Sequence, residues 1–559
     1  MKRLILFFLS LYLCLEVGAQ YEWEINTSLR SCQKEVRAVW LTTLNGLDWP
    51  RKPATTKAGA TRQKKELCDI LDRLQQAGIN TILFQTRVRS TTAYPSTIEP
   101  WDGAFTGTPG RAPLYDPLAF VIEECHKRNM ELHAWVVAFP ICKTAVEKKL
   151  GKQALPKKRP ELCQRCGDQW MMDPGVPGTD KYIASICREI VENYAVNGIH
   201  LDYIRYPEKG ISFNDARTYK KYGKKKAKAA WRRENVTRCV RAIHKEIKSI
   251  RPWVKLSCSP IGKYADLPTQ SSYGWNARDA VYQDVQAWLR DGLMDLIFPM
   301  MYFDGKHFYP FAVNWKENSY GKPVVPGLGI YFLSKKEKDW PLNTIRRQLN
   351  FLRQQDLGGQ AYFRSKFLTD NTKGIYDFIA SDFYTRPALL PAMTWADKSI
   401  PVAPKVQLTQ TGHTLRFNWE EIDDATPIHY NIYRIEKNDT LLLAQRLRTT
   451  SFSYTPALPH LLYEKYAVTA TDAYGNESKK ELLQLINERY LPAGVVDSVA
   501  LPEVETAEYA LVTDIFGRHV LTCRYAERIN VSKLDAGCYE VRTLGPKGDS
   551  HKVAFFRKL

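Results

Sequence analysis

The sequence predicts an α/β protein: a (β/α)8 TIM barrel followed by all-β sandwich domains. Across residues 34–390, short apolar runs alternate with amphipathic helical stretches, and this alternation is typical of parallel strands joined by crossover helices. Eight strand–helix units occur, and this number favours a closed barrel over an open doubly wound sheet. A glycine-rich phosphate fingerprint does not follow the first strand, which argues further against a nucleotide-binding sheet. After Pro401, strand-like alternation replaces the helical pattern.

Each barrel element is assigned from its hydrophobic periodicity. The predicted strands are Val36–Leu44, Thr81–Val88, Glu131–Phe139, Gly198–Tyr206, Val254–Pro260, Asp295–Phe303, Val324–Tyr331 and Gly359–Phe363. The predicted helices are Lys65–Ala77, Pro117–Asn129, Asp180–Asn197, Trp231–Arg251, Arg278–Asp291, Phe308–Asn318, Leu342–Gln355 and Thr372–Ser381.

Two β domains are expected after the barrel. Residues 402–488 contain short strands with turn residues between them, the pattern of a β-sandwich. This region resembles a fibronectin type III domain, whose early tryptophan and late Tyr-x-Val-x-Ala-x-Asp run correspond to Trp419 and Tyr466–Asp472. A linker at Tyr490–Val504 precedes residues 504–559, which look like the C-terminal sorting domains of Bacteroidetes-type secretion systems. A small adhesive sandwich is the alternative for this last region.

The N-terminus predicts export. Residues 1–19 have a basic start, an apolar stretch and small residues before the expected cleavage site, the layout of a secretory signal peptide. That stretch is too short to span a bilayer permanently, and no later segment reaches the ~20 apolar residues of a membrane helix. Lipidation of Cys14 is disfavoured because Leu13 precedes it, where lipoprotein signals have a small residue. We expect a protein of the periplasm, the outer-membrane surface or the medium.

The net charge indicates which class of partner to expect, and the cysteine spacing helps to decide between a disulfide and a zinc site. The formal net charge of +20 favours polyanions, and for an exported protein anionic cell-wall glycan fits better than nucleic acid, which is not expected. The lysine-rich segment 217–233 is interpreted as a solvated loop and helix face. Cys163-x-x-Cys166, with Cys142 upstream, lies in a polar, basic insert and predicts a local disulfide, because a single CxxC lacks the second ligand pair of a zinc site.

Polar and aromatic residues gather at the carboxyl ends of the predicted strands, where a barrel enzyme builds its active site. Aromatic planes at such a mouth suit sugar rings, whose hydroxyls seek charged and amide partners. The candidate substrate-binding residues are Arg87, Glu99, Trp101, Trp135, Tyr203, Arg205 and Tyr302, and the candidate catalytic residues are Asp202 and Asp304.

Ten motifs in order resemble glycosyl-hydrolase-like family 10, barrel proteins of bacterial envelopes. They are Val36–Leu41, Asp48–Pro50, Phe84–Arg87, Glu99–Trp101, Asp116–Leu118, Glu131–Trp135, Asp173–Gly175, Gly198–Pro207, Trp231–Asn235 and Phe298–Tyr302. The resemblance implies hydrolysis of glycosidic bonds, with some members acting on peptidoglycan glycan strands stripped of their peptides. Two departures matter: Tyr203 stands where many members have a second aspartate, and Thr91–Ala93 replaces a common Gly-Asp-Ala.

Glycosidases normally use two carboxylates, one to protonate the leaving oxygen and one to attack or to activate water. Resemblance to α-galactosidase- and amylase-like barrels implies that Asp202 is the nucleophile. The second carboxylate is open among Asp304, Glu99, Glu208 and Glu234, and Asp304 is favoured because it follows strand six. Met301-Tyr302-x-Asp304 also resembles the strand-six motif of chitinases, in which the substrate acetamido group attacks, although Phe303 is an extra residue.

Two other functions compete with an exported glycoside hydrolase acting on an envelope or extracellular polysaccharide. A non-catalytic glycan-binding barrel is motivated by the missing aspartates. A metal hydrolase such as a polysaccharide deacetylase would need more ligands than His133 and His200. Neither a metal nor another cofactor is therefore expected, and peptidoglycan glycan is the first candidate substrate.

Overall fold

The computed structural model describes residues 34–208, 210–223, 225–270, 274–436, 439–457, 464–484, 494–495, 497–504, 507–514, 517–545 and 550–559. The predicted signal peptide and Cys14 lie outside these residues. Within the described ranges, no helix is both long and apolar enough to cross a membrane.

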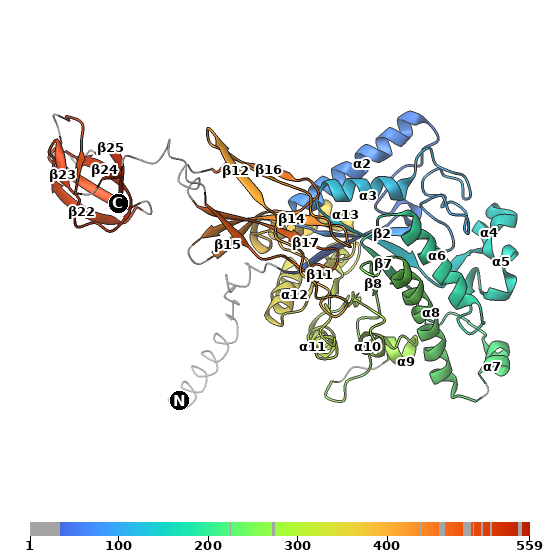
Figure 1. The fold of residues 1–559 in the computed structure, drawn as a ribbon. Coiled ribbons are helices and arrows are strands. Elements are labelled where there is room, and N and C mark those ends of the chain that lie inside the picture. The colour runs from blue at the N-terminus through green and yellow to red at the C-terminus, as the bar shows by residue number, and fades with distance from the viewer. Residues whose placement is uncertain are drawn as a thin grey trace, which may run out of the picture.

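The predicted barrel is confirmed. Eight parallel strands form one sheet in the order β10-β11-β1-β2-β3-β7-β8-β9 (Figure 1). Parallel bridges from Ile297 to Val324 and from Met300 to Gly327 join the two outer strands and close the sheet. The strands are β1 (Val36–Leu41), β2 (Thr81–Arg87), β3 (Glu131–Val137), β7 (Gly198–Asp202), β8 (Lys255–Cys258), β9 (Leu296–Ile297), β10 (Gly327–Leu328) and β11 (Gly359–Tyr362). Each lies inside a predicted strand.

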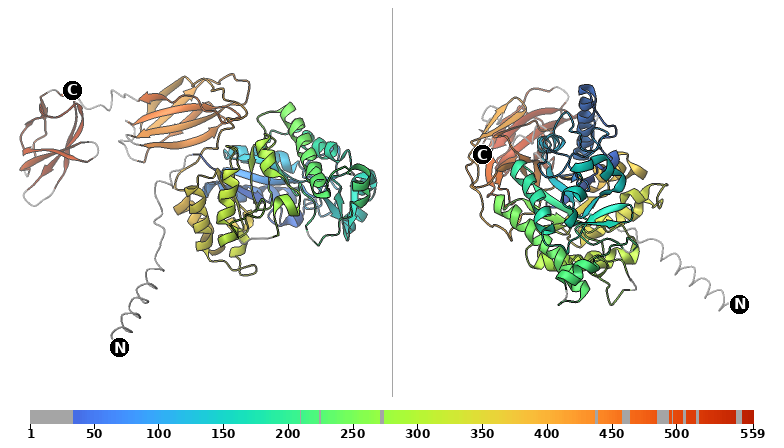
Figure 2. Two further views of the ribbon diagram at one scale, coloured as in Figure 1. Left: turned by 90° about the horizontal axis from the view of Figure 1, so that it is seen from below. Right: turned by 90° about the vertical axis from the view of Figure 1, so that its right-hand side faces the viewer.

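Helices surround the barrel in two views (Figure 2). They include α2 (Lys57–Gln76), α3 (Pro117–Lys127), α6 (Thr179–Asn193), α8 (Lys228–Ile250), α10 (Val285–Arg290), α11 (Tyr309–Glu317), α12 (Leu342–Gln354) and α14 (Ile375–Phe378). Local sequence sets their starts: Thr56 and Asp116 accept hydrogen bonds from Gly59 N and Ala119 N as N-caps of α2 and α3.

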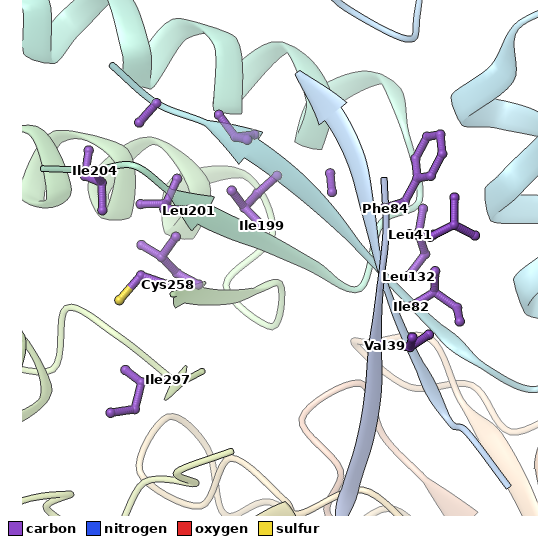
Figure 3. Packing of buried hydrophobic residues seen from close by; sticks show 14 of the residues in the cluster. Val39, Leu41, Ile82, Phe84, Leu132, Ile199, Leu201, Ile204, Cys258 and Ile297 are labelled. Atoms are coloured by element: carbon purple, nitrogen blue, oxygen red, sulfur yellow. The ribbon is translucent and has the colours of Figure 1, made fainter. Parts of the chain in front are cut away.

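The barrel strands are buried on both faces, as expected of a parallel sheet covered by helices. Their outward residues pack against the helices, and Figure 3 labels several of them, among them Leu41, Phe84 and Leu201. Alternate residues form a second cluster that includes Trp40, Trp135 and Phe298. Because the side chains of a strand alternate between its faces, this second cluster fills the barrel interior.

One predicted helix is divided. Arg278–Asp291 forms α9 (Ala277–Ala280) and α10, separated by Tyr282, whose φ is 65°. The Tyr282 ring lies 5.4 Å from that of Tyr206, and its hydroxyl accepts a hydrogen bond of 3.0 Å from Arg232. This tertiary packing holds the backbone in a left-handed conformation that a helix cannot accommodate.

An insert after β3 contains β4 (Pro140–Lys143), α4 (Thr144–Leu150), α5 (Leu155–Lys158), β5 (Cys163–Cys166) and β6 (Gln169–Met172). The strands form a small sheet in the order β4-β6-β5. Cys163 and Cys166 are free thiols at the two ends of β5. Residues three apart on a strand are about 10 Å apart, beyond the reach of a disulfide, so Cys163 and Cys166 do not pair with each other. Cys142 of β4 is also a free thiol, so the structure contains none of the local disulfides that the sequence predicted for this insert.

The described strands after the barrel form two sandwich sheets and two C-terminal sheets. The sandwich strands are β12 (Val406–Thr411), β13 (Thr414–Trp419), β14 (His429–Glu436), β15 (Asp439–Leu447), β16 (Ser451–Tyr454), β17 (Lys465–Thr471) and β18 (Glu481–Gln484). They pair as β12-β13-β16 and β15-β14-β17-β18. Arg446 of β15 lies 3.3 Å from Glu131 of β3, which joins this sandwich to the barrel floor.

The C-terminal strands are β19 (Gly494–Val495), β20 (Ser498–Ala500), β21 (Tyr509–Asp514), β22 (His519–Arg524), β23 (Arg528–Asn530), β24 (Gly537–Leu544) and β25 (Lys552–Lys558). They form a sheet in the order β19-β25-β24-β21-β22 and a pair β20-β23. Strands β19 and β20 fall inside the predicted linker Tyr490–Val504, so part of that linker belongs to the C-terminal sheets.

Candidate active site

Asp202 is the last residue of β7, at the carboxyl mouth of the barrel, and its side chain is 6% exposed. The Trp135 Nε1–H of neighbouring β3 donates a 3.2 Å hydrogen bond to Oδ2 of Asp202. The Tyr203 backbone N–H donates to Oδ1 at 2.7 Å. The carboxylate is therefore held in one orientation by donors from two strands.

The surroundings of Asp202 act on its pKa in opposite directions. Burial raises the pKa of Asp202, whereas the Arg205 charge and hydrogen bonds from the Tyr203 amide, Ser259 and Trp135 lower it. Burial is the larger influence, so the pKa lies above that of an exposed aspartate. A buried carboxylate with several donors at a barrel mouth suits proton transfer or nucleophilic attack.

Tyr203 follows Asp202 with φ of 50°, a conformation uncommon for a bulky side chain. Its ring lies 4.4 Å from Cζ of Arg205 in a cation–π contact. Burial and the Asp202 charge raise the pKa of the Tyr203 phenol. The residue that departs from the family pattern therefore packs beside Asp202 as part of the same site.

Arg205 is 4% exposed. One nitrogen, Nη2, lies 3.5 Å from the Glu208 carboxylate, while Nε and Nη1 have no hydrogen-bond partner among the described residues. The guanidinium also lies 5.7 Å from the Trp275 ring. Arg205 thus links Asp202, Tyr203 and Glu208 electrostatically.

Tyr302 comes from the segment after β9, a strand separated from β7 by β8 alone. Burial and then the charge of Asp202 raise the pKa of Tyr302 well above its ordinary value. Its ring lies 5.4 Å from Phe363 and 5.8 Å from Tyr331. The structure therefore brings five of the predicted residues into one group: Trp135, Asp202, Tyr203, Arg205 and Tyr302.

Arg87 and Glu99 form a buried ion pair instead. Arg87 Nε and Nη2 donate to the two Glu99 oxygens at 2.7 and 2.6 Å, and the side chains are 0% and 1% exposed. Arg87 also donates to the carbonyls of Val137 and Ala138 at the end of β3, and Tyr182 donates to Glu99 at 3.0 Å. With its acceptors occupied, Glu99 ties the loop after β2 to the barrel. Trp101 is half-buried in that loop, bridged to Thr92.

The other three candidate acids, Asp304, Glu234 and Glu208, differ in what their side chains contact. Asp304 is exposed, and its carboxylate accepts from the Gly305 amide at 2.7 Å as the cap of a short turn. Glu234 is half-exposed on α8 and pairs with Lys226. Glu208 contacts Arg205, and its charge raises the pKa of Tyr203. Among the four, the described contacts join Glu208 to the Asp202 group.

Sequence reasoning missed Ser259 and Trp275. Ser259 directly follows β8 and shares the alternation of Ser257, so strand periodicity could have placed it at the mouth. Trp275 lies in an irregular segment that carries no such signal.

The two histidines lie in the barrel away from any ligand cluster. His200 Nε2 accepts from Trp40 Nε1 at 3.1 Å, and His133 Nε2 lies 3.2 Å from Glu131. Across the described ranges, no group of three or more His, Cys, Asp or Glu residues could hold a metal ion.

Comparison with known proteins gives concordant matches. The model of a family described as Glycosyl hydrolase-like 10 matches residues 35–332. Glycosyl hydrolase YngK of Bacillus subtilis (strain 168) is 34% identical over 475 residues, covering 80% of this chain and 92% of that protein. Glycosyl hydrolase DigH of Escherichia coli (strain K12) is 33% identical over 367 residues, covering 60% of this chain and 83% of that protein.

Among solved structures, the glycoside hydrolase domain of PgaB (BpsB) from Bordetella bronchiseptica aligns with a TM-score of 0.41 at 14% identity, over 62% of this chain and 98% of that domain. The family assignment rests on the sequence matches. The chain belongs to the glycosyl hydrolase-like 10 family.

Proposed function

We propose that this protein is an exported glycoside hydrolase that cleaves an envelope or extracellular polysaccharide, with peptidoglycan glycan strands as the first candidate substrate. The observation that carries the proposal is Asp202, a buried carboxylate at the carboxyl mouth of the barrel that accepts hydrogen bonds from Trp135 and from the Tyr203 amide. Family membership and relatives named glycosyl hydrolases support the reaction class.

In this proposal Asp202 attacks the anomeric carbon. Its orientation by Trp135 and the Tyr203 amide supplies the fixed geometry that covalent catalysis needs. Arg205 favours the ionised form of Asp202, and Tyr302 and Tyr203 offer aromatic and hydroxyl surface to a sugar ring.

Cleavage also needs a carboxylic acid that protonates the leaving glycosidic oxygen. The sequence favoured Asp304, but the ion pair of Glu208 with Arg205 and the effect of the Glu208 charge on the pKa of Tyr203 make Glu208 the better-supported partner. Glu99 is a weaker choice because its oxygens already accept from Arg87 and Tyr182.

The accessory regions fit an exported enzyme. We assign residues 402–488 to a fibronectin type III domain, supported by the pairing of three strands in one sheet and four in the other and by the Trp419–Tyr430 contact of 5.1 Å. We assign residues 504–559, together with β19 and β20, to a C-terminal sorting or adhesion domain. The predicted signal peptide at residues 1–19 completes this proposal for localisation.

A non-catalytic glycan-binding barrel is the second candidate, and it is favoured by Tyr203 at the position of a second aspartate. The deciding experiment incubates the purified protein with peptidoglycan glycan strands freed of peptides by an amidase. New reducing ends, identified by mass spectrometry, support hydrolysis. Binding of the strands without new ends, under conditions where a known glycosidase cleaves them, would favour the binding protein.

A further inference from the structure

The barrel interior beneath Asp202 contains a polar network within an otherwise apolar core. Its side chains are Trp40 of β1, His200 of β7 and Ser257 of β8, each at most 1% exposed. Trp40 and Phe298 belong to the cluster that fills the barrel, and the His200 ring lies 5.8 and 5.1 Å from their rings. His200 is therefore enclosed by the barrel and out of contact with solvent.

The hydrogen bonds of this network run in one direction. Trp40 Nε1–H donates to Nε2 of His200 at 3.1 Å, and because an indole nitrogen only donates, the proton of the neutral imidazole is on Nδ1. Nδ1–H donates to Ser257 Oγ at 3.0 Å, and the Ser257 hydroxyl donates to the Ile199 carbonyl at 3.4 Å. Burial and the nearby His133 lower the pKa of His200 well below its ordinary value. The ring is therefore held neutral in a single tautomer.

Two glycines leave the space that the interior rings occupy. A Cβ atom at Gly198, two residues before His200 on β7, would lie 2.8 Å from the His133 ring, and one at Gly327 would lie 2.9 Å from the Trp40 ring. Glycine permits such a close approach of a ring to the backbone. The rings in and below the network are therefore fitted closely against the barrel wall.

The network joins strands that are not neighbours. β1 and β7 are separated in the sheet by β2 and β3, so the hydrogen bond between Trp40 and His200 crosses the barrel interior. Burying these polar groups costs desolvation free energy that an apolar side chain at residue 200 would avoid. A fully hydrogen-bonded buried network instead selects one arrangement of the elements that carry it.

Asp202 and its hydrogen-bond donor both extend from the layer that contains His200. Asp202 follows His200 by two residues on β7, on the same face and about 7 Å further along the strand. Trp135 is paired with His200 in the register of β3 and β7, and its Nε1–H donates to Oδ2 of Asp202. The position of His200 thus affects both partners of the Trp135–Asp202 hydrogen bond.

We infer that His200 is a positioning residue for the reaction at Asp202. Held by Trp40 and Ser257, it fixes β7 along its own axis and so sets the Asp202 carboxylate against the Trp135 indole and the sugar. His200 itself touches no substrate and exchanges no proton. This inference rests on the proposed function, because it assigns a role in that same reaction.

His200→Phe tests the inference, because it keeps a ring and removes both hydrogen bonds of the imidazole. Since a displacement of about 1 Å at a reacting group can cost roughly 100-fold in rate, kcat on peptide-free glycan strands should fall roughly 10- to 100-fold. KM should change less than about threefold, because the groups that contact the sugar remain. His200→Gln should restore most of kcat, because its amide oxygen can accept from Trp40.

Trp40→Phe approaches the same network from the other side. It removes the donor to His200 and should lower kcat with little change in KM. Added to His200→Phe, it should have little further effect, because both substitutions break the same hydrogen bond. Independent, multiplicative effects of the two substitutions on kcat would contradict the shared role.

Tyr94→Phe is the matched control for lost stability. It removes a buried hydrogen bond of 2.9 Å to Glu189, and Tyr94 packs in the outer cluster between the barrel and its helices. Urea unfolding should show a loss of stability in this variant as in His200→Phe, whereas its kcat should stay at the wild-type value. Equal losses of kcat in the two variants would assign the effect of His200 to stability alone.

A measurement without turnover separates this inference from the proposed hydrolysis. The Trp135 indole N–H is followed by NMR in protein labelled with ¹⁵N-tryptophan and is identified by its absence in Trp135→Phe. His200→Phe should shift this signal and speed its hydrogen exchange, and Tyr94→Phe should do neither. These changes in a protein that hydrolyses no glycan would support the coupling of His200 to Asp202 and reject the hydrolase. A folded His200→Phe protein with wild-type kcat and an unchanged Trp135 signal would overturn the inference and leave the hydrolase standing.

Discussion

Trp135 and Asp202 are joined by a 3.2 Å hydrogen bond between neighbouring strands β3 and β7. Both side chains are at least nine-tenths buried. A donor fixed by the barrel interior thus aims at the carboxylate that the proposal places at the anomeric carbon.

Trp135→Phe tests this relationship, because it keeps an aromatic ring and removes only the donor. Hydrogen bonds to charged groups contribute about 1.5–3 kcal/mol, so kcat/KM should fall roughly 10- to 100-fold. Initial rates on peptide-free glycan strands give the value. An unchanged rate would show that the bond does not position Asp202 for reaction.

Arg205→Gln tests the electrostatics of the site. The Arg205 charge lowers the pKa of Asp202, so its loss should raise that pKa further. If the carboxylate is the reactive form, activity rises with pH through this pKa, and the acidic limb of the kcat/KM profile should move to higher pH. Arg205→Lys should leave the limb closer to the wild-type position. A limb that stays in place in Arg205→Gln would assign it to another group.

Glu99→Gln separates a structural role from a substrate-binding one. Removing the partner of a buried arginine costs about 3–5 kcal/mol of unfolding free energy, and the Arg87–Glu99 pair is fully buried. Urea unfolding followed by tryptophan fluorescence measures this loss. Asp69→Asn in the exposed Lys65–Asp69 pair is the matched control and should change stability by under ~1 kcal/mol. A Glu99→Gln protein that keeps its stability but binds glycan more weakly would show that Glu99 binds substrate.

Glu131→Gln tests the ion cluster where the sandwich meets the barrel floor. Burial alone would raise the pKa of Glu131, but Lys255 at 2.6 Å and Arg446 at 3.3 Å hold it well below its ordinary value. Its stabilising effect is present above the unfolded pKa of about 4.3 and is lost as pH falls through the lower folded pKa. The substitution should therefore cost about 3–5 kcal/mol at pH 7 and progressively less below pH ~4. If Glu131→Gln lowered the free energy of unfolding equally at pH 7 and below pH ~4, this explanation would be wrong.

Much of the fold could be predicted because apolar periodicity is local. All eight barrel strands lie within the predicted runs, and Asp202 at the end of β7 follows from a charge that closes an apolar strand. The break in the predicted helix at Tyr282 could not be foreseen, since it depends on contacts with Tyr206 and Arg232, which come from distant segments.

The site could be predicted only in part for the same reason: its side-chain contacts join distant segments of the chain. From its position at the end of a strand, Arg87 is predicted to bind substrate. The folded loop shows instead that its guanidinium forms an ion pair with Glu99. Asp304 follows strand six closely in sequence, yet the chain turns at Gly305 and leaves its side chain exposed. Pairings between loops decide which polar residues face the substrate, and periodicity carries no information about them.

The most direct test of the central claim is the activity of Asp202 variants on peptide-free glycan strands, with Asp202→Asn first shown by thermal unfolding at pH 8 to be folded. Because burial disfavours the Asp202 charge, this variant should be no less stable than the wild type. We expect Asp202→Asn to lose at least a thousandfold in kcat, and we expect azide to restore cleavage by Asp202→Gly with formation of a glycosyl azide. Retention of more than a tenth of wild-type hydrolysis by Asp202→Asn would contradict the central claim.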